Sequence, residues 1–169
     1  MLEISLAAPA ERPLLANLLE KYLYEFSQWE KTDVGPEGLY GYEWLDYYFT
    51  QERRYPYLLR VDGKLAGFVL VNDYPEVPDA KTDFCISEFF IMHKYRRQGH
   101  GRAAVFHVLD QHHGRWQLKC HPHNVPSVHF WRSVIDEYTG GHFRLVEGYP
   151  NREADYLDGT PANVFFFEN

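Results

Sequence analysis

The sequence predicts a mixed α/β fold, in which about four helices cover a central sheet of about six to seven strands. Segments with apolar residues three and four apart, which indicate helices, are interleaved with short apolar or alternating segments, which indicate strands. The chain has 169 residues, and 45% of them are apolar. We therefore expect one domain over residues 1–169 with a sizeable core.

The N-terminal part is expected to hold a strand and two helices. Leu2–Leu6 is a short strand, and Pro13 suits the first turn of a helix whose apolar residues continue to Phe26. The run VGPEG at 34–38 breaks this helix, and a second short helix is expected over Tyr42–Phe49.

The middle of the chain predicts a hairpin followed by a long strand. Asp62-Gly63 is a strong signal for a tight turn, and it separates the strands Tyr57–Val61 and Lys64–Val71. After a proline-containing loop, Phe84–Met92 forms a mostly apolar strand.

The last third alternates helices and strands. The expected elements are a helix over Gly101–His112, a strand over 116–120, a helix over Pro126–Tyr138, and strands over Phe143–Val146 and Val164–Phe167. Gln117 and Lys119 alternate with apolar residues, which predicts a half-buried strand, and Gly140-Gly141 ends the last helix.

Composition excludes several classes of protein. A net charge of −7 and a pI near 5.7 argue against a general nucleic-acid binder. Cys85 and Cys120 alone make neither a disulfide framework nor a zinc set, which predicts a reducing, cytoplasmic location. The opening residues lack the features of a signal peptide, and no uncharged apolar run is long enough to cross a membrane.

The charge is distributed unevenly along the chain. Residues 20–52 contain eight acidic and two basic residues, together with ten aromatic ones. Residues 93–102 contain four bases and no acid. A local cationic patch on an acidic protein indicates a specific anion site.

The basic segment joins a strand to a helix through two closely spaced glycines. Gly99 and Gly101 allow a tight turn, and the following helix start offers unpaired N–H donors and a partial positive charge. With Arg96, Arg97 and Arg102 this pattern predicts a cradle for a diphosphate. Alternatively, the glycines serve only the turn and the arginines are solvated. The spacing fits neither a P-loop nor the dinucleotide fingerprint.

Three segments resemble the GNAT superfamily of acyl-CoA-dependent N-acyltransferases, in particular a bacterial subgroup of predicted acetyltransferases. RRQGHG at 96–101 resembles the family's Q/R-x-x-G-x-G/A signature, and FFI at 89–91 stands where its fourth strand ends. NVPSVHFW at 124–131 resembles its N-x-x-A-x-x-(F/L)-Y pattern. The order of the expected elements also agrees, which implies the GNAT fold, with a sheet splayed between strands four and five.

This resemblance implies acetyl-CoA as co-substrate. The residues that it places against acetyl-CoA are Phe90, Ile91, Met92, Arg96, Arg97, Gln98, Gly99, His100, Gly101, Arg102, Asn124 and Trp131. The loop would hold the diphosphate through its backbone more than its side chains, and the N–H of Ile91 would polarise the thioester carbonyl. Asn124 would bind the pantetheine arm, a role compatible with capping a helix.

The resemblance further implies direct attack of a primary amine on the thioester. Glu88 is the candidate base, because an acid inside an apolar strand has a raised pKa. It could instead face solvent or pair with an arginine, with the proton leaving through water or the substrate. Trp131 stands where many GNAT enzymes have a tyrosine that protonates the thiolate, and indole is no practical acid. An acyl-CoA-binding module without turnover is therefore the main alternative, ahead of an unrelated phosphate-binding protein.

The acceptor is expected to be a small-molecule or peptide amine. Aromatic and acidic residues that suit a cationic amine are Trp29, Asp33, Glu37, Tyr40, Tyr42, Glu43 and Trp44, which could equally form a solvated face. No metal is expected, because neither His112-His113 nor His121 and His123 complete a ligand motif; the latter pair is expected at the surface or in a loop. No nucleic acid or membrane partner is expected, and a homodimer is left open by analogy.

Overall fold

The computed structural model describes residues 1–78 and 80–169. Within them lie seven strands and four α-helices in this order: β1 Leu2–Leu6, α1 Arg12–Glu30, α2 Tyr47–Thr50, β2 Tyr55–Val61, β3 Lys64–Asn72, β4 Phe84–Ile91, α3 His100–Gln111, β5 Arg115–Cys120, α4 Val125–Thr139, β6 Phe143–Val146 and β7 Asn163–Glu168. The predicted mixed α/β fold is confirmed.

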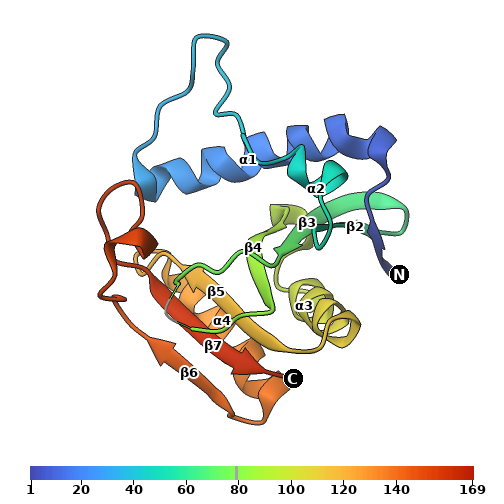
Figure 1. The fold of residues 1–169 in the computed structure, drawn as a ribbon. Helices are drawn as coiled ribbons and strands as arrows, with labels where there is room; N and C mark the ends of the chain where they lie inside the picture. The colour runs from blue at the N-terminus through green and yellow to red at the C-terminus, as the bar shows by residue number, and fades with distance from the viewer. Residues whose placement is uncertain (79) are drawn as a thin grey trace.

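The strands form one sheet in the order β1-β2-β3-β4-β5-β7-β6 (Figure 1). Neighbouring strands are antiparallel except for β4 and β5, which are parallel. These two strands pair only through Phe84 with Trp116 and Cys85 with Gln117, and then diverge. This confirms the expected splay and opens a gap in the sheet toward the end of β4.

Helices cover both faces of the sheet, with α1 and α2 on one side and α3 and α4 on the other (Figure 1). Because side chains alternate along a strand, each strand supplies both cores. Phe68 and Phe90 pack toward α1, whereas Val69 and Ile91 pack toward α3 and α4.

The hairpin prediction is confirmed in detail. Asp62 and Gly63 have φ angles of 50° and 73°, the left-handed pair that a tight turn between twisted strands requires. The last helix also ends as predicted, because Gly140 caps it at a φ of 62°.

Two local expectations need correction. The second helix spans only Tyr47–Thr50, because residues 43–46 form turns, in which the N–H groups of Leu45 and Tyr47 bond the carbonyls three residues back. Gln117 is fully buried although β5 was expected to be half-buried. Its amide bonds the backbone of Val77 and the Thr82 hydroxyl, so this polar side chain is satisfied under a loop.

None of the helices in the described residues is long and apolar enough to cross a membrane.

Candidate active site

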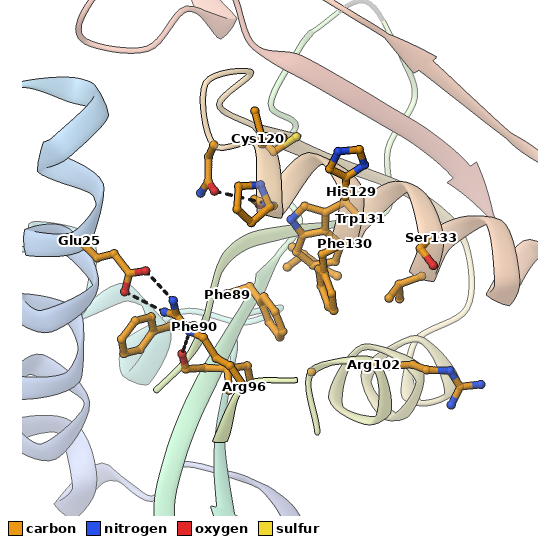
Figure 2. A pocket seen from close by; sticks show the side chains of 18 of the residues that line it. Glu25, Phe89, Phe90, Arg96, Arg102, Cys120, His129, Phe130, Trp131 and Ser133 are labelled. Carbon is orange, nitrogen blue, oxygen red and sulfur yellow. Dashed lines mark hydrogen bonds and ion pairs between the residues drawn. The ribbon is translucent and has the colours of Figure 1, made fainter. Parts of the chain in front are cut away.

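A cavity of about 1010 Å³ opens where β4 and β5 diverge (Figure 2). Its walls come from α1, β4, the loop before α3 with the first turn of α3, the end of β5, and one face of α4. The predicted contact residues in these walls are Phe90, Ile91, Arg96, Arg97, Gly99, Gly101, Arg102, Asn124 and Trp131. Glu88, Met92, Gln98 and His100 do not line the cavity.

The loop between β4 and α3 ends in an unsatisfied helix start. Arg97 and Gly99 have φ angles of 58° and 81°, and the first helical hydrogen bond runs from the Ala103 N–H to the Gly99 carbonyl over 3.0 Å. The N–H groups ahead of Ala103 therefore have no partner within the helix. A Cβ added to Gly99 would meet nothing within 4 Å, so this side of the loop is open. Such a helix start attracts anions.

The second glycine of the loop serves close packing. A Cβ at Gly101 would lie 3.2 Å from a ring carbon of Phe130 and 3.4 Å from one of Phe89. These two rings are stacked, with their centroids 5.2 Å apart, and line the cavity. Gly101 thus lets the start of α3 approach β4 and α4.

Arg96 ties this loop to α1 and β4. Its guanidinium donates to both carboxylate oxygens of Glu25 over 2.7 and 2.8 Å, and its Nε donates to the Ile91 carbonyl over 2.6 Å (Figure 2). The pair is partly buried, with 34% of the Arg96 and 22% of the Glu25 side chain exposed. Arg96 is therefore committed to holding the loop, so its side chain is not free to bind an anion.

Removal of this pair should reduce stability. Arg96→Ala leaves Glu25 and the Ile91 carbonyl without their donor, and we expect the free energy of unfolding to fall by about 1.5–3 kcal/mol. Arg132→Ala is the control, because Arg132 pairs with Glu147 at the surface and should cost at most about 1 kcal/mol. Urea unfolding measures both variants, and equal losses would contradict the special position of Arg96.

The other two arginines of this segment, Arg97 in the loop and Arg102 in the first turn of α3, differ in their partners. Arg102 donates to Glu137 of α4 at the surface. Arg97 is exposed, and in the described part of the chain no carboxylate pairs with it. Arg97 is thus the arginine of the loop whose charge remains available to a ligand.

The backbone of β4 turns alternate N–H groups toward the gap in the sheet. The Met92 N–H bonds the Ala66 carbonyl of β3 over 2.8 Å. Because adjacent residues point their N–H groups to opposite edges, Phe90 also bonds toward β3, whereas Phe89 and Ile91 face the gap. Of the three residues expected against acetyl-CoA at this end of β4, Ile91 turns its N–H to the gap, whereas Phe90 and Met92 turn theirs to β3.

Trp131 and Asn124 lie in the wall formed by α4. The Trp131 side chain is 5% exposed and packs edge-on against Phe89, with ring centroids 5.1 Å apart (Figure 2). Asn124 caps α4, because its side-chain oxygen accepts the Ser127 N–H over 3.3 Å. Its amide nitrogen remains a donor beside the cavity.

A β-bulge determines where Glu88 points. Leu70 pairs with Glu88 while Val71 pairs with Ile86, so Ser87 is an extra residue in β4. Ile86 faces the core under α3 and α4, and without the bulge Glu88 would follow it there. The bulge instead turns Glu88 toward α1, on the same side as Phe90.

Two tyrosine hydroxyls hold the Glu88 carboxylate. Tyr22 of α1 donates to Oε2 over 2.5 Å, and Tyr42 donates to Oε1 over 3.0 Å. Burial raises the pKa of Glu88 to about 7, although the two hydroxyl donors oppose that shift. Glu88 therefore changes its charge near neutral pH, as a general base must. The apolar spacing of this helix predicts buried residues but gives no sign of a contact between Tyr22 and Glu88.

The raised pKa of Glu88 predicts a pH-dependent stability. Between its ordinary value of 4.5 and about 7, the folded chain keeps the proton that the unfolded chain loses, so this group makes stability fall as pH rises. Glu88→Gln removes that dependence. We therefore expect the Tm of Glu88→Gln minus the Tm of the wild type to be larger at pH 8 than at pH 4.5. Scanning calorimetry at both pH values measures these differences, and equal differences would contradict the raised pKa of Glu88.

His121 and His123 lie in the loop between β5 and α4, as expected, and His123 is exposed, but His121 is not at the surface. His121 is completely buried, its Nδ1 accepts the His123 N–H over 3.2 Å, and its Nε2 lies 3.4 Å from a carboxylate oxygen of Asp158. In the neutral ring the proton is then on Nε2, facing the carboxylate. His112 contacts the Tyr57 hydroxyl over 2.8 Å on another part of the sheet. The expected absence of a metal remains a prediction.

Two aromatic residues of the acidic segment at 20–52, one in α1 and one after it, lie at or near the cavity. Trp29 lines the cavity and Tyr42 contacts Glu88. The carboxylates expected in this role are exposed: Asp33, Glu37 and Glu43.

Other carboxylates gather on the α1 side. Burial raises the pKa of Glu30 and of Glu76, and the charge of Glu76 also raises that of Glu88. Lys119 of β5 lies 3.3 Å from Glu76 and lines the cavity, and its ammonium is 5.2 Å from the ring centre of Tyr156. We call Glu30, Glu76 and Glu88 the acidic cluster.

Cys120 lies in the cavity wall but is an inert thiol. It is 3% exposed, and burial raises its pKa to about 12. A thiol with such a pKa is protonated at neutral pH and is a poor nucleophile.

Comparisons with known proteins agree with this geometry. The sequence model of the Acetyltransferase (GNAT) family matches residues 19–134, more than half of the chain. A comparison with curated proteins finds no match.

Solved structures are similar in fold over nearly the whole chain. The acetyltransferase from Thermus thermophilus has a TM-score of 0.68 at 18% identity and covers 100% of this chain and 97% of its own. A GNAT-family acetyltransferase from Streptococcus agalactiae has 0.70 at 17%, covering 99% and 95%. The ribosomal-protein-S18-alanine N-acetyltransferase from Escherichia coli has 0.61 at 16%, covering 99% and 94%.

Proposed function

Because the chain belongs to the Acetyltransferase (GNAT) family, we propose that it transfers an acetyl group from acetyl-CoA to a primary amine. The observation that carries this proposal is the open, unsatisfied start of α3 on the wall of the cavity between β4 and β5. Its N–H groups suit the diphosphate of acetyl-CoA. The gap in the sheet leaves room for the pantetheine arm beside β4, with the Asn124 amide as a donor to it.

The chemistry follows from the groups around the gap. Alkylammonium ions have a pKa near 10, so the amine must lose a proton before it attacks. Glu88 receives this proton, since its carboxylate is half ionised near pH 7. The backbone N–H of Ile91 stabilises the oxyanion that forms when the amine adds to the thioester. The C–S bond then breaks, and the thiolate takes one proton as CoA leaves.

The acidic cluster favours a cationic acceptor. Glu30, Glu76 and Glu88 are offset only partly by Lys119, and Trp29 adds an aromatic face. These carboxylates do not line the cavity, but their negative charge would attract an ammonium group that lies in the cavity against Trp29. A small-molecule or peptide amine with a positive charge fits these surroundings.

A second candidate function, favoured by Trp131, is that of an acyl-CoA-binding module without turnover. The residue is buried and aromatic, and its indole cannot protonate a thiolate. A thiolate with a pKa near 8.5 is nevertheless a tolerable leaving group, so we favour the enzyme.

Thiol release from acetyl-CoA with a panel of primary amines tests the proposal. We expect CoA release that depends on the amine and an acetylated product by mass spectrometry. Calorimetry on the same preparation measures acetyl-CoA binding. Binding without product from any amine would support the module, and the absence of binding would contradict both functions.

A further inference from the structure

The Glu88 carboxylate is not exposed on the cavity wall. Tyr22 lines the cavity and Glu88 does not, and the Tyr22 hydroxyl bonds the Glu88 oxygen over 2.5 Å. Tyr22 is itself fixed, since it is 7% exposed and packs edge-on against Phe68 and Phe90. Glu88 is partly exposed but does not line this cavity, so an amine that lies in the cavity can pass a proton to the Glu88 carboxylate through the Tyr22 hydroxyl.

We propose that Tyr22 is a catalytic residue that relays a proton from the acceptor amine to Glu88. This inference rests on the proposed acetyl transfer. The ammonium proton passes to the Tyr22 oxygen while the hydroxyl proton passes to Oε2 of Glu88. The products of the step are a neutral amine, an unchanged phenol and a neutral carboxylic acid, so charge and protons balance.

The proton that remains on the amine nitrogen and the proton held by Glu88 are both accounted for in the later steps. Attack by the neutral amine gives a tetrahedral intermediate whose nitrogen still carries an extra proton. When the C–S bond breaks, this proton accompanies the thiolate to give CoASH. Glu88 then loses its own proton to solvent, and the net reaction releases one proton per amide formed.

Tyr22 acts in this step as a neutral phenol. Burial and the neighbouring Glu88 charge both raise the pKa of Tyr22, so its phenolate does not form near neutral pH. A phenol that accepts one proton as it donates another needs no such charged state. The arrangement therefore suits a concerted relay.

Tyr42 provides a matched comparison on the other carboxylate oxygen. It donates to Oε1 over 3.0 Å, but it does not line the cavity. Tyr22→Phe and Tyr42→Phe each remove one hydroxyl donor from Glu88 and keep the ring. Both should raise the pKa of Glu88, because each donor lowers it. Only Tyr22→Phe should interrupt the proton path.

The test is the pH profile of kcat/KM for both variants with an amine that the wild type acetylates. Tyr42→Phe should shift the rising limb to higher pH and then regain the wild-type plateau. Tyr22→Phe should lower the plateau by about 100-fold, the scale of general-base catalysis, and recover only as the amine deprotonates in solution. Calorimetric acetyl-CoA affinity should match the wild type in both variants.

Different results would separate the relay from the function on which it rests. Equal profiles for the two variants would contradict the relay but leave acetyl transfer intact. A wild type that acetylates no amine would contradict the proposed function, and the relay with it. A proton inventory on the wild type under single-turnover conditions needs no variant: two protons in flight predict a curved plot, and a straight line contradicts the relay.

Discussion

Gly99→Val should abolish measurable acetyl-CoA binding while the chain stays folded. Gly99 has a φ of 81°, a region that valine rarely adopts, and it precedes the helix start whose N–H groups we expect to hold the diphosphate. If the backbone at residue 99 relaxes to a negative φ to accommodate valine, the N–H groups of the helix start point in another direction. Because the position is open to solvent space, the new side chain meets no neighbour in the core. Calorimetric titration with acetyl-CoA measures the loss.

Gly63→Val is the matched control. Gly63 has a φ of 73°, and a Cβ there would also meet nothing within 4 Å. It lies in the hairpin between β2 and β3 and does not line the cavity. Both variants therefore bear a similar backbone cost, and only Gly99→Val should lose the ligand. Retained affinity in Gly99→Val would contradict the cradle.

Glu88→Gln should lower kcat/KM by about 100- to 10,000-fold, the range of general-base catalysis. In the wild type we expect kcat/KM to rise with pH around an apparent pKa of about 7, because the carboxylate must be ionised to accept a proton. Glutamine takes no proton, so the variant should lose this limb and rise only toward the pKa of the amine.

The acetyl-CoA affinity of Glu88→Gln provides the control, since Glu88 faces α1 rather than the wall under the loop. We expect this affinity to be unchanged in calorimetry. A variant that keeps the wild-type pH profile would assign the base to another group or to water.

The parts of the site that are local in sequence were predictable. The loop with Gly99 and Gly101, the helix that follows it and the cap at Asn124 each depend on residues within one turn or one strand–loop–helix unit. Backbone chemistry at such places is set by residue type, since glycine permits a positive φ and asparagine caps a helix. The element order followed from periodicity for the same reason.

The contacts that assemble the proposed catalytic groups were not predictable. Tyr22 is 66 residues from Glu88, and Tyr42 is 46 residues away. Their meeting depends on the bulge at Ser87, which reverses the face of β4 without any glycine or proline to mark it. The burial of His121 depends likewise on the distant loop that carries Asp158.

The Arg96 interaction shows the same limit. Its charge and place in the loop were evident, but its bidentate bond to Glu25 joins residues 71 apart. The sequence therefore predicted a cationic loop, whereas in the structure one of its arginines is bound to α1 and another to α4.

Parallel calorimetric titration of the wild type with acetyl-CoA and with S-acetylpantetheine tests most directly whether the start of α3 holds the diphosphate. The two compounds share the thioester and the pantetheine arm, and acetyl-CoA adds the diphosphate and the 3′-phosphoadenosine, so the same pair of titrations on Gly99→Val assigns the difference to the helix start. We predict clear binding of acetyl-CoA and far weaker binding of S-acetylpantetheine. Equal affinities would contradict the account.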